Sequence, residues 1–149
     1  YKNKENHFIF LAFKYHMLIF KTQDGYPIDI PKTFHGYNVL KKIGSGSTCI
    51  VVLVESQVTQ QRYSAKIISK LDIIHRHMLQ SIMREISVMK TLSHPNIIQF
   101  QEFFEMENED QEEFFVIVTE YCSNGDLLEY ATTKGFESEK IKKRIILKK

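Results

Sequence analysis

The sequence predicts an α+β fold, in which one major helix packs across an antiparallel sheet of five strands. Short runs of β-branched and aromatic residues follow one another through short polar connections, which favours a meander of strands. One longer segment repeats its apolar residues with the period of a helix. The chain has 149 residues, a length that suits one domain or one lobe of a larger domain.

The first three strands are expected in the first half of the chain. The second and third are joined by polar residues, whereas the first and second are joined by Gly44-Ser45-Gly46. Two strands joined through glycines form a hairpin whose tip can lie close over a ligand. The three strands are Tyr37 to Gly44, Cys49 to Glu55 and Arg62 to Ser69.

The glycine-containing turn and a nearby lysine form the first candidate site. Glycine has no Cβ, so the backbone N–H groups of the turn can approach phosphate oxygens. Lys66 lies between Ala65 and Ile67 on the third strand and can supply the positive charge. The alternative interpretation is an ordinary Gly-Ser turn with a solvated lysine, and residues further along the chain separate the two.

A helix is expected from Ile73 to Leu92, and the following His94-Pro95 ends it because proline cannot continue a helix. Glu85 lies in the middle of its apolar stripe. A carboxylate there is costly unless a cation meets it, and Lys66 is the cation already placed on a nearby strand. The alternative is that Glu85 reaches solvent at the edge of the stripe. The stripe consists of Met78, Ile82, Ile86, Met89 and Leu92.

Two further strands are expected at Ile97 to Phe104 and at Phe114 to Tyr121. The second is apolar on both faces, which is typical of a central strand that is covered on both sides. The acidic residues between the two strands, Glu105 to Glu113, form either a solvated hairpin loop or a docking site for a basic partner. A turn at Cys122 and short helices follow.

The ends of the chain are interpreted from their turn residues and charges. Asp24-Gly25, Pro27 and Pro31 indicate turn or linker chemistry. The folded domain is therefore expected to begin near His35. The basic residues from Lys140 to Lys149 indicate a solvated helix face, with nucleic-acid or lipid contact as the alternative. The predicted parts are an extension or linker of unknown role (1–33), a folded lobe (34–121), and a hinge with the start of a second, truncated lobe (122–149).

Composition argues against several classes of partner. The net charge of +2 gives no global electrostatic reason to expect binding to nucleic acid or membrane. The longest unbroken apolar run, Phe8 to Phe13, is far shorter than a spanning helix. Cys49 and Cys122 have no metal-ligand spacing, so no metal site is expected. Two cysteines of this kind favour a reduced setting, and a cytoplasmic location is predicted.

The order of glycine turn, strand lysine, helix glutamate, His94-Pro95-Asn96 and Glu120-Tyr121 resembles the N-terminal, ATP-binding lobe of protein kinases. The resemblance covers about Phe34 to Ile146. The stretch from Glu120 to Tyr130 is most similar to serine/threonine kinases of the calcium/calmodulin-dependent group. It implies a kinase-like lobe followed by the first helices of the other lobe.

The resemblance also implies a site for ATP. Lys66 would hold the α- and β-phosphates and pair with Glu85, and Val51 would pack on the adenine. Cys49 stands where the family has a third glycine, and Ser64 stands where it usually has alanine, which puts a hydroxyl against the base. The residues assigned to the nucleotide are Ile43, Gly44, Ser45, Gly46, Val51, Ser64, Lys66, Glu85, Thr119, Glu120, Cys122 and Asp126.

The connection to the second lobe would hold the edge of the nucleotide. By the resemblance, Thr119 guards the back of the pocket. Glu120 offers its backbone C=O and Cys122 its backbone N–H to the adenine edge. Asp126 reaches the ribose.

The complete enzyme implied by this resemblance moves the γ-phosphate of ATP to a Ser or Thr hydroxyl of a protein substrate. The family's His-Arg-Asp and Asp-Phe-Gly motifs do not occur in the 149 residues. No catalytic residue is therefore assigned, Mg²⁺ is expected only with the complete enzyme, and this chain alone is expected to be inactive. The alternatives are a non-catalytic scaffold or interaction module, and a gene fragment without function.

Overall fold

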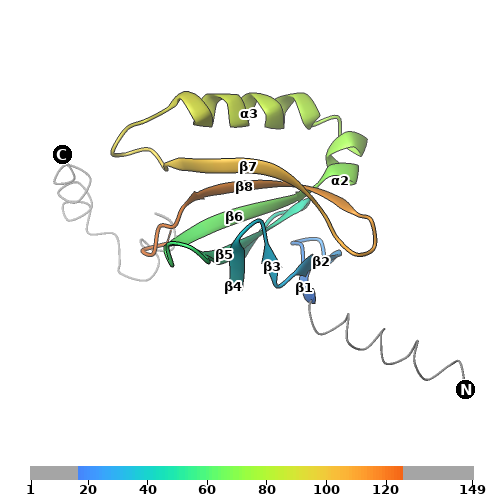
Figure 1. Ribbon diagram of the computed structural model, residues 1–149. Coiled ribbons are helices and arrows are strands. Elements are labelled where there is room, and N and C mark those ends of the chain that lie inside the picture. Colours follow the sequence, from blue (N-terminus) through green and yellow to red (C-terminus); the bar gives the residue numbers. More distant parts are fainter. Residues whose placement is uncertain (1–16, 126–149) are drawn as a thin grey trace, which may run out of the picture.

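A computed structural model describes residues 17–125 of the protein, and residues 1–16 and 126–149 lie outside the description. Within it, a six-stranded antiparallel sheet has the strand order β3-β4-β5-β6-β8-β7. A separate antiparallel hairpin, β1-β2, and two helices, α2 and α3, complete the fold (Figure 1). The elements are β1 (Met17–Lys21), β2 (Pro27–Pro31), β3 (Thr33–Phe34), β4 (Tyr37–Ser45), β5 (Cys49–Ser56), β6 (Arg62–Ser69), α2 (Lys70–His75), α3 (Leu79–Thr91), β7 (Phe100–Glu107) and β8 (Glu113–Glu120).

The predicted α+β fold, with its long strands, is confirmed. The sheet has one strand more than expected, because the two-residue β3 pairs with the start of β4. Strand β7 begins at Phe100 instead of Ile97, since the backbone N–H of Ile97 donates to the carbonyl of His94 and closes a turn there.

The sheet is covered on both faces, and strand β8 shows this most directly (Figure 1). Its residues Phe114 to Val118 are all buried. Phe114, Val116 and Val118 belong to a core shared with the β1-β2 hairpin, whereas Phe115 and Ile117 belong to a core shared with α3. Because successive side chains of a strand point to opposite faces, the apolar run supplies both cores. The predicted central strand is therefore confirmed.

The N-terminal hairpin corrects the expectation of linker chemistry before His35. Strands β1 and β2 pair antiparallel from Met17–Pro31 to Lys21–Pro27. Ile28 and Ile30 of β2 are buried in the core beneath the sheet. The folded part of the chain thus begins at least as early as Met17. For the residues before Met17, a separate extension stays a prediction.

The expected single helix from Ile73 to Leu92 is two helices. His77, between α2 and α3, has a positive φ of 54°, which a continuous right-handed helix does not allow. Helix α2 begins earlier than predicted, where the hydroxyl of Ser69 accepts a hydrogen bond from the backbone N–H of Asp72. The stripe is buried at Ile82 and Ile86 but not at Met78 and Leu92.

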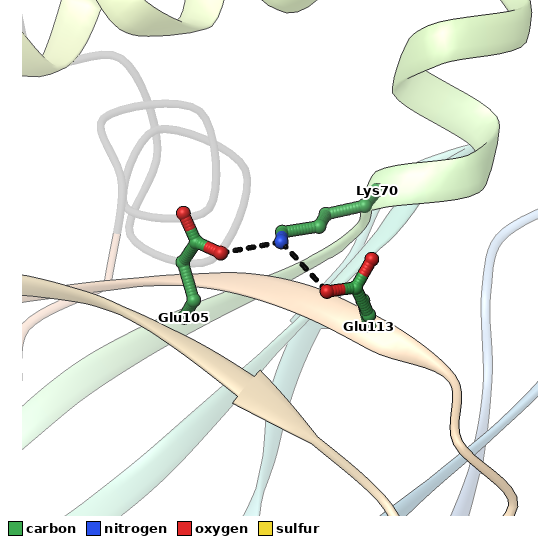
Figure 2. Close-up of polar contacts among 3 residues, drawn as sticks. All are labelled: Lys70, Glu105 and Glu113. Atoms are coloured by element: carbon green, nitrogen blue, oxygen red, sulfur yellow. Dashed lines mark hydrogen bonds and ion pairs between the residues drawn. The ribbon is translucent and has the colours of Figure 1, made fainter.

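The acidic turn between β7 and β8 is held in place by two sets of contacts. Lys70, the first residue of α2, pairs with Glu105 and Glu113 on the two strands (Figure 2). The hydrogen bond to Glu105 raises the pKa of Lys70 above its usual value, although burial acts in the opposite direction.

The buried Asn108 fixes the turn itself. Its Oδ1 accepts from the backbone N–H groups of Asp110 and Glu112. Its Nδ2 donates to the Asp29 carbonyl at 3.0 Å and to Glu112 Oε2 at 2.8 Å. A solvated loop, the simpler of the two sequence interpretations, therefore describes only part of this turn, because Asn108 joins it to β2.

Candidate functional site

Residues from three adjacent strands meet on the sheet face that α3 covers. The pairing register places Val51 opposite Lys66, and Lys66 opposite Ile117. Ile117 packs in the core with Ile82 and Ile86 of α3, so these cross-strand neighbours share the helix-covered face. One rung further along, Ser64 lies opposite Thr119. The register thus brings together four of the residues assigned from the sequence.

Lys66 and Glu85 approach each other across the gap between sheet and helix. Lys66 Nζ lies 4.0 Å from Glu85 Oε1, and the two side chains are 40% and 53% exposed. The exposure of Glu85 agrees with the alternative interpretation, in which its carboxylate reaches solvent at the edge of the apolar stripe. The carboxylate nevertheless faces Lys66, the predicted cation. An ion pair this exposed contributes about 0–1 kcal/mol to stability. The charges therefore remain available to a ligand.

The glycine turn is tight because of a contact with Cys49. The backbone N–H of Gly46 donates to the Cys49 carbonyl at 2.9 Å. A Cβ placed on Gly46 would lie 3.0 Å from Cys49 Sγ, a distance too short for an unstrained contact. At Gly44, a Cβ would meet Val51 at an ordinary 3.5 Å. Gly46 is therefore the tighter of the two positions, where an added Cβ requires the Cys49 side chain to shift.

The β1-β2 hairpin contacts the glycine turn, and the sequence analysis did not foresee this contact. The backbone N–H of Gln23 donates to the Gly46 carbonyl at 2.9 Å, and Lys42 Nζ donates to the Lys21 carbonyl at 2.6 Å. Asp24-Gly25 between two short apolar runs is a standard hairpin signal, and Gly25 adopts a φ of +86° in the turn. That signal could have identified the hairpin.

The end of β8 leads the chain away from the sheet at Cys122. Glu120 holds the segment before β7: its Oε1 accepts from the Gln99 N–H at 3.0 Å, and its own N–H donates to the Gln99 carbonyl at 2.9 Å. Cys122 is exposed. The last assigned residue, Asp126, lies outside the described residues. Ile43 and Ser45 are exposed on β4, next to the turn.

The donors on this face suit an anion better than a metal ion. Lys66 offers an ammonium group, and Glu85 is the carboxylate beside it, whereas the Gly46 N–H of the turn donates to the Cys49 carbonyl. Across residues 17–125, no cluster of three or more His, Cys, Asp or Glu side chains is placed to hold a metal ion. The positive charge that this face offers to a ligand is therefore the ammonium group of Lys66.

A model of the protein kinase domain matches residues 37–148. The chain belongs to the protein kinase family. The kinase-like N-lobe predicted from the sequence is thereby confirmed, and the match also extends over residues that the structure does not describe.

Curated relatives that this chain matches include serine/threonine kinases and a calcium-dependent protein kinase. Serine/threonine-protein kinase SIK1 of Rattus norvegicus is 37% identical over 103 residues, which is 69% of this chain and 12% of the relative. Serine/threonine-protein kinase cds1 of Schizosaccharomyces pombe is 32% identical over 66% of this chain and 21% of the relative. Calcium-dependent protein kinase 12 of Oryza sativa subsp. japonica is 32% identical over 70% of this chain and 19% of the relative. The chain thus spans between 12% and 21% of the length of these kinases.

No helix within residues 17–125 combines the length and apolarity needed to cross a lipid bilayer.

Proposed function

We propose that this chain is the ATP-binding portion of a serine/threonine protein kinase, whose complete form transfers the γ-phosphate of ATP to a protein Ser or Thr. The observation that carries the proposal is the placement of Lys66. It lies on the helix-covered face of the sheet, directly opposite Val51 on the neighbouring strand, and its Nζ is 4.0 Å from Glu85 Oε1. Membership of the family and the names of the relatives support the serine/threonine class.

Each assigned residue has a proposed part in holding the nucleotide. Lys66 neutralises the α- and β-phosphates, and Glu85 orients its ammonium group. The glycine turn from Gly44 to Gly46 covers the phosphates. A bound polyanion draws Lys66 inward, and an exposed ion pair held at 4.0 Å leaves the ammonium group free to make that movement.

The adenine lies against the rungs next to Lys66. Val51 and Ser64 supply its contact surface, and Thr119 closes the back of the pocket. Backbone groups of Glu120 and Cys122 bind its edge. Asp126, outside the described residues, would reach the ribose.

We further propose that these 149 residues bind nucleotide without transferring phosphate. Bound Mg²⁺ neutralises charge on the transferring phosphate in this family. Among the described residues, Lys66 supplies positive charge to the phosphates. It is not a general base that could take the proton from a substrate hydroxyl. A protein substrate is expected only for the complete enzyme, and the cytoplasmic location stays a prediction.

Nucleotide titration of the 149-residue chain tests the proposal. A fluorescent ATP analogue should bind to the unmodified chain, and Lys66→Met should weaken the binding at least tenfold. Lys32→Met is the matched control because Lys32 is exposed and lies outside the site. It should change the Kd by less than twofold. Equal binding by the Lys66→Met chain would contradict the assignment of Lys66.

The titration, together with urea unfolding of the same chain, separates the alternatives. A non-catalytic interaction module with this fold predicts cooperative unfolding without nucleotide affinity. A fragment without function predicts neither. Phosphate transfer to a generic substrate peptide by the 149-residue chain, abolished by Lys66→Met, would contradict the proposed inactivity.

A further inference from the structure

A cleft of about 520 Å³ opens on the molecule between the turn of the β1-β2 hairpin, helix α2 and the acidic turn. Its lining includes Thr22 and Tyr26 from the hairpin, Leu71 and Ile74 from α2, and Glu112 from the acidic turn. The lining shares no residue with those assigned to the nucleotide. The volume lies within the usual range of ligand sites.

The cleft combines a buried apolar floor with exposed apolar walls. Ile28 and Phe114 are among its lining residues and are buried. Tyr26, Leu71 and Ile74 are 62%, 63% and 56% exposed. Single exposed apolar side chains are common on any surface, but these three come from two segments and stand around one cavity. Such an arrangement is typical of a binding surface.

The charge of the lining is acidic. It contains the carboxylates of Asp72, Glu112 and Glu113 and the ammonium group of Lys70. Lys70 is already paired with Glu113, and also with Glu105 outside the lining (Figure 2). An anionic ligand would therefore meet carboxylates without a free lysine to receive it, whereas a cationic ligand is attracted.

The wall on the side of the acidic turn is preformed. Asn108 binds this turn to β2 through the Asp29 carbonyl and holds Glu112 through its side chain. Its backbone also closes the turn, because the N–H of Asn108 donates to the Glu112 carbonyl at 3.0 Å. A surface that is already ordered loses less conformational entropy when it binds.

We propose that this cleft is a docking site for a short segment of a partner protein that carries apolar side chains next to lysine or arginine. Apolar side chains fill the floor at Ile28 and Phe114, and the basic residues face Asp72 and Glu112. The exposed apolar residues lie on two sides of the cavity, which gives an extended chain contacts beyond the cavity itself. A peptide therefore matches the surface better than a small organic cation.

Fluorescence anisotropy with the 149-residue chain tests the docking site. The probe is a fluorescein-labelled 12-residue peptide that alternates Lys-Arg and Leu-Ile pairs. One control peptide replaces Lys and Arg by Glu, and a second replaces Leu and Ile by Ser. Both control peptides should bind at least tenfold more weakly than the probe.

Variants of the chain locate the binding. Leu71→Ser with Ile74→Ser removes apolar contact at exposed positions and should weaken the probe at least fivefold. The matched control, Val58→Ser with Ile98→Ser, removes two other exposed apolar residues outside the lining and should leave the Kd within twofold. Urea midpoints of both double variants show whether they remain folded, and Tyr26→Ser repeats the test if the first variant does not.

A second pair of variants tests the charge. Asp72→Asn with Glu112→Gln should weaken the probe at least fivefold. Glu109→Gln with Asp110→Asn removes two charges from the same turn outside the lining. This pair should change log Kd for the probe by less than half as much as the first pair does. An equal loss from both pairs would show non-specific attraction to the acidic turn and overturn the proposal.

Two further results decide the class of ligand. One such result is that spermine displaces the probe at the same concentration as the unlabelled peptide does. The other is that the Ser-substituted peptide binds as well as the probe. Either result would mean that the cleft binds cations without recognising apolar side chains, and the proposal would be wrong. Lys66→Met should leave the probe's Kd unchanged, so failure of peptide docking and failure of nucleotide binding are independent outcomes.

Discussion

Replacing Ile30 by alanine tests whether the β1-β2 hairpin is part of the folded lobe. Ile30 is completely buried, in the core shared by β2 and the sheet. The substitution removes three carbon atoms, and at about 0.8 kcal/mol for each buried methylene the transfer term alone is about 2.5 kcal/mol. The cavity left behind adds to this, because cores relax only partly, so the expected loss of unfolding free energy is about 3 kcal/mol.

Urea denaturation followed by circular dichroism measures this loss. Ile19→Ala is the matched control, because Ile19 lies on the same hairpin, opposite Asp29, and is 58% exposed. Its expected cost is about 0.5 kcal/mol. If both substitutions cost the same small amount, the hairpin does not contribute to the core in solution, and the N-terminal segment is a linker as the sequence suggested.

Three further predictions follow from the polar contacts. Glu85→Gln should change the unfolding free energy by less than about 1 kcal/mol, because its pair with Lys66 is exposed, yet it should weaken binding of the fluorescent ATP analogue several-fold; unchanged affinity would remove the pair from the site. Asn108→Asp replaces the Nδ2 donor that binds the Asp29 carbonyl by a carboxylate oxygen, and should lower the unfolding free energy in urea by about 2 kcal/mol, a loss that a solvated loop would not show. Burial and the hydrogen bond to Glu102 raise the pKa of Tyr37 well above its usual value. The unfolded chain therefore loses this proton near pH 10, while the folded chain keeps it. Stability should fall as the pH rises above about 10, and a Tyr37→Phe chain should show a shallower fall in urea midpoint between pH 9 and 11; parallel curves would contradict the assignment.

The sheet was predictable because its strongest signal is local. Phe114 to Val118 contains no polar residue, so a strand there must be covered on both faces, and the two cores on either side of β8 follow directly. The turn at Gly44 to Gly46 was equally evident. In both cases the residues whose pattern predicts the strand or the turn are the same residues that form it.

The break between α2 and α3 was not predictable from periodicity. The predicted helix ran from Ile73 to Leu92 with its apolar stripe beginning at Met78, and Ile73 and Ile82 are both buried in the structure, although in different helices. The chain turns between them at His77, and the Met78 N–H donates to the Ile73 carbonyl at 2.9 Å. Neither histidine nor methionine is a residue type that predicts such a turn, because the turn depends on how the two helices pack.

The sequence named candidate residues for the site but left the geometry of the Lys66–Glu85 pair open. The sequence placed Glu85 inside an apolar stripe, which left two interpretations: an ion pair with Lys66, or a carboxylate that reaches solvent at the edge of the stripe. Packing of Ile82 and Ile86 against the sheet sets the rotation of α3, and this rotation leaves Glu85 more than half exposed. Only the tertiary contacts decide between a buried and an exposed pair, so the alternatives remained open until the fold was known.

The hairpin links the two surfaces proposed to bind ligands. On one side, Gln23 holds the Gly46 carbonyl of the glycine turn. On the other side, Thr22 and Tyr26 line the acidic cleft, and the Thr22 hydroxyl accepts from the Tyr26 N–H at 3.1 Å within the same turn. These residues are consecutive or nearly so, and Ile28 anchors the following strand in the core. One short turn therefore carries contacts to both surfaces.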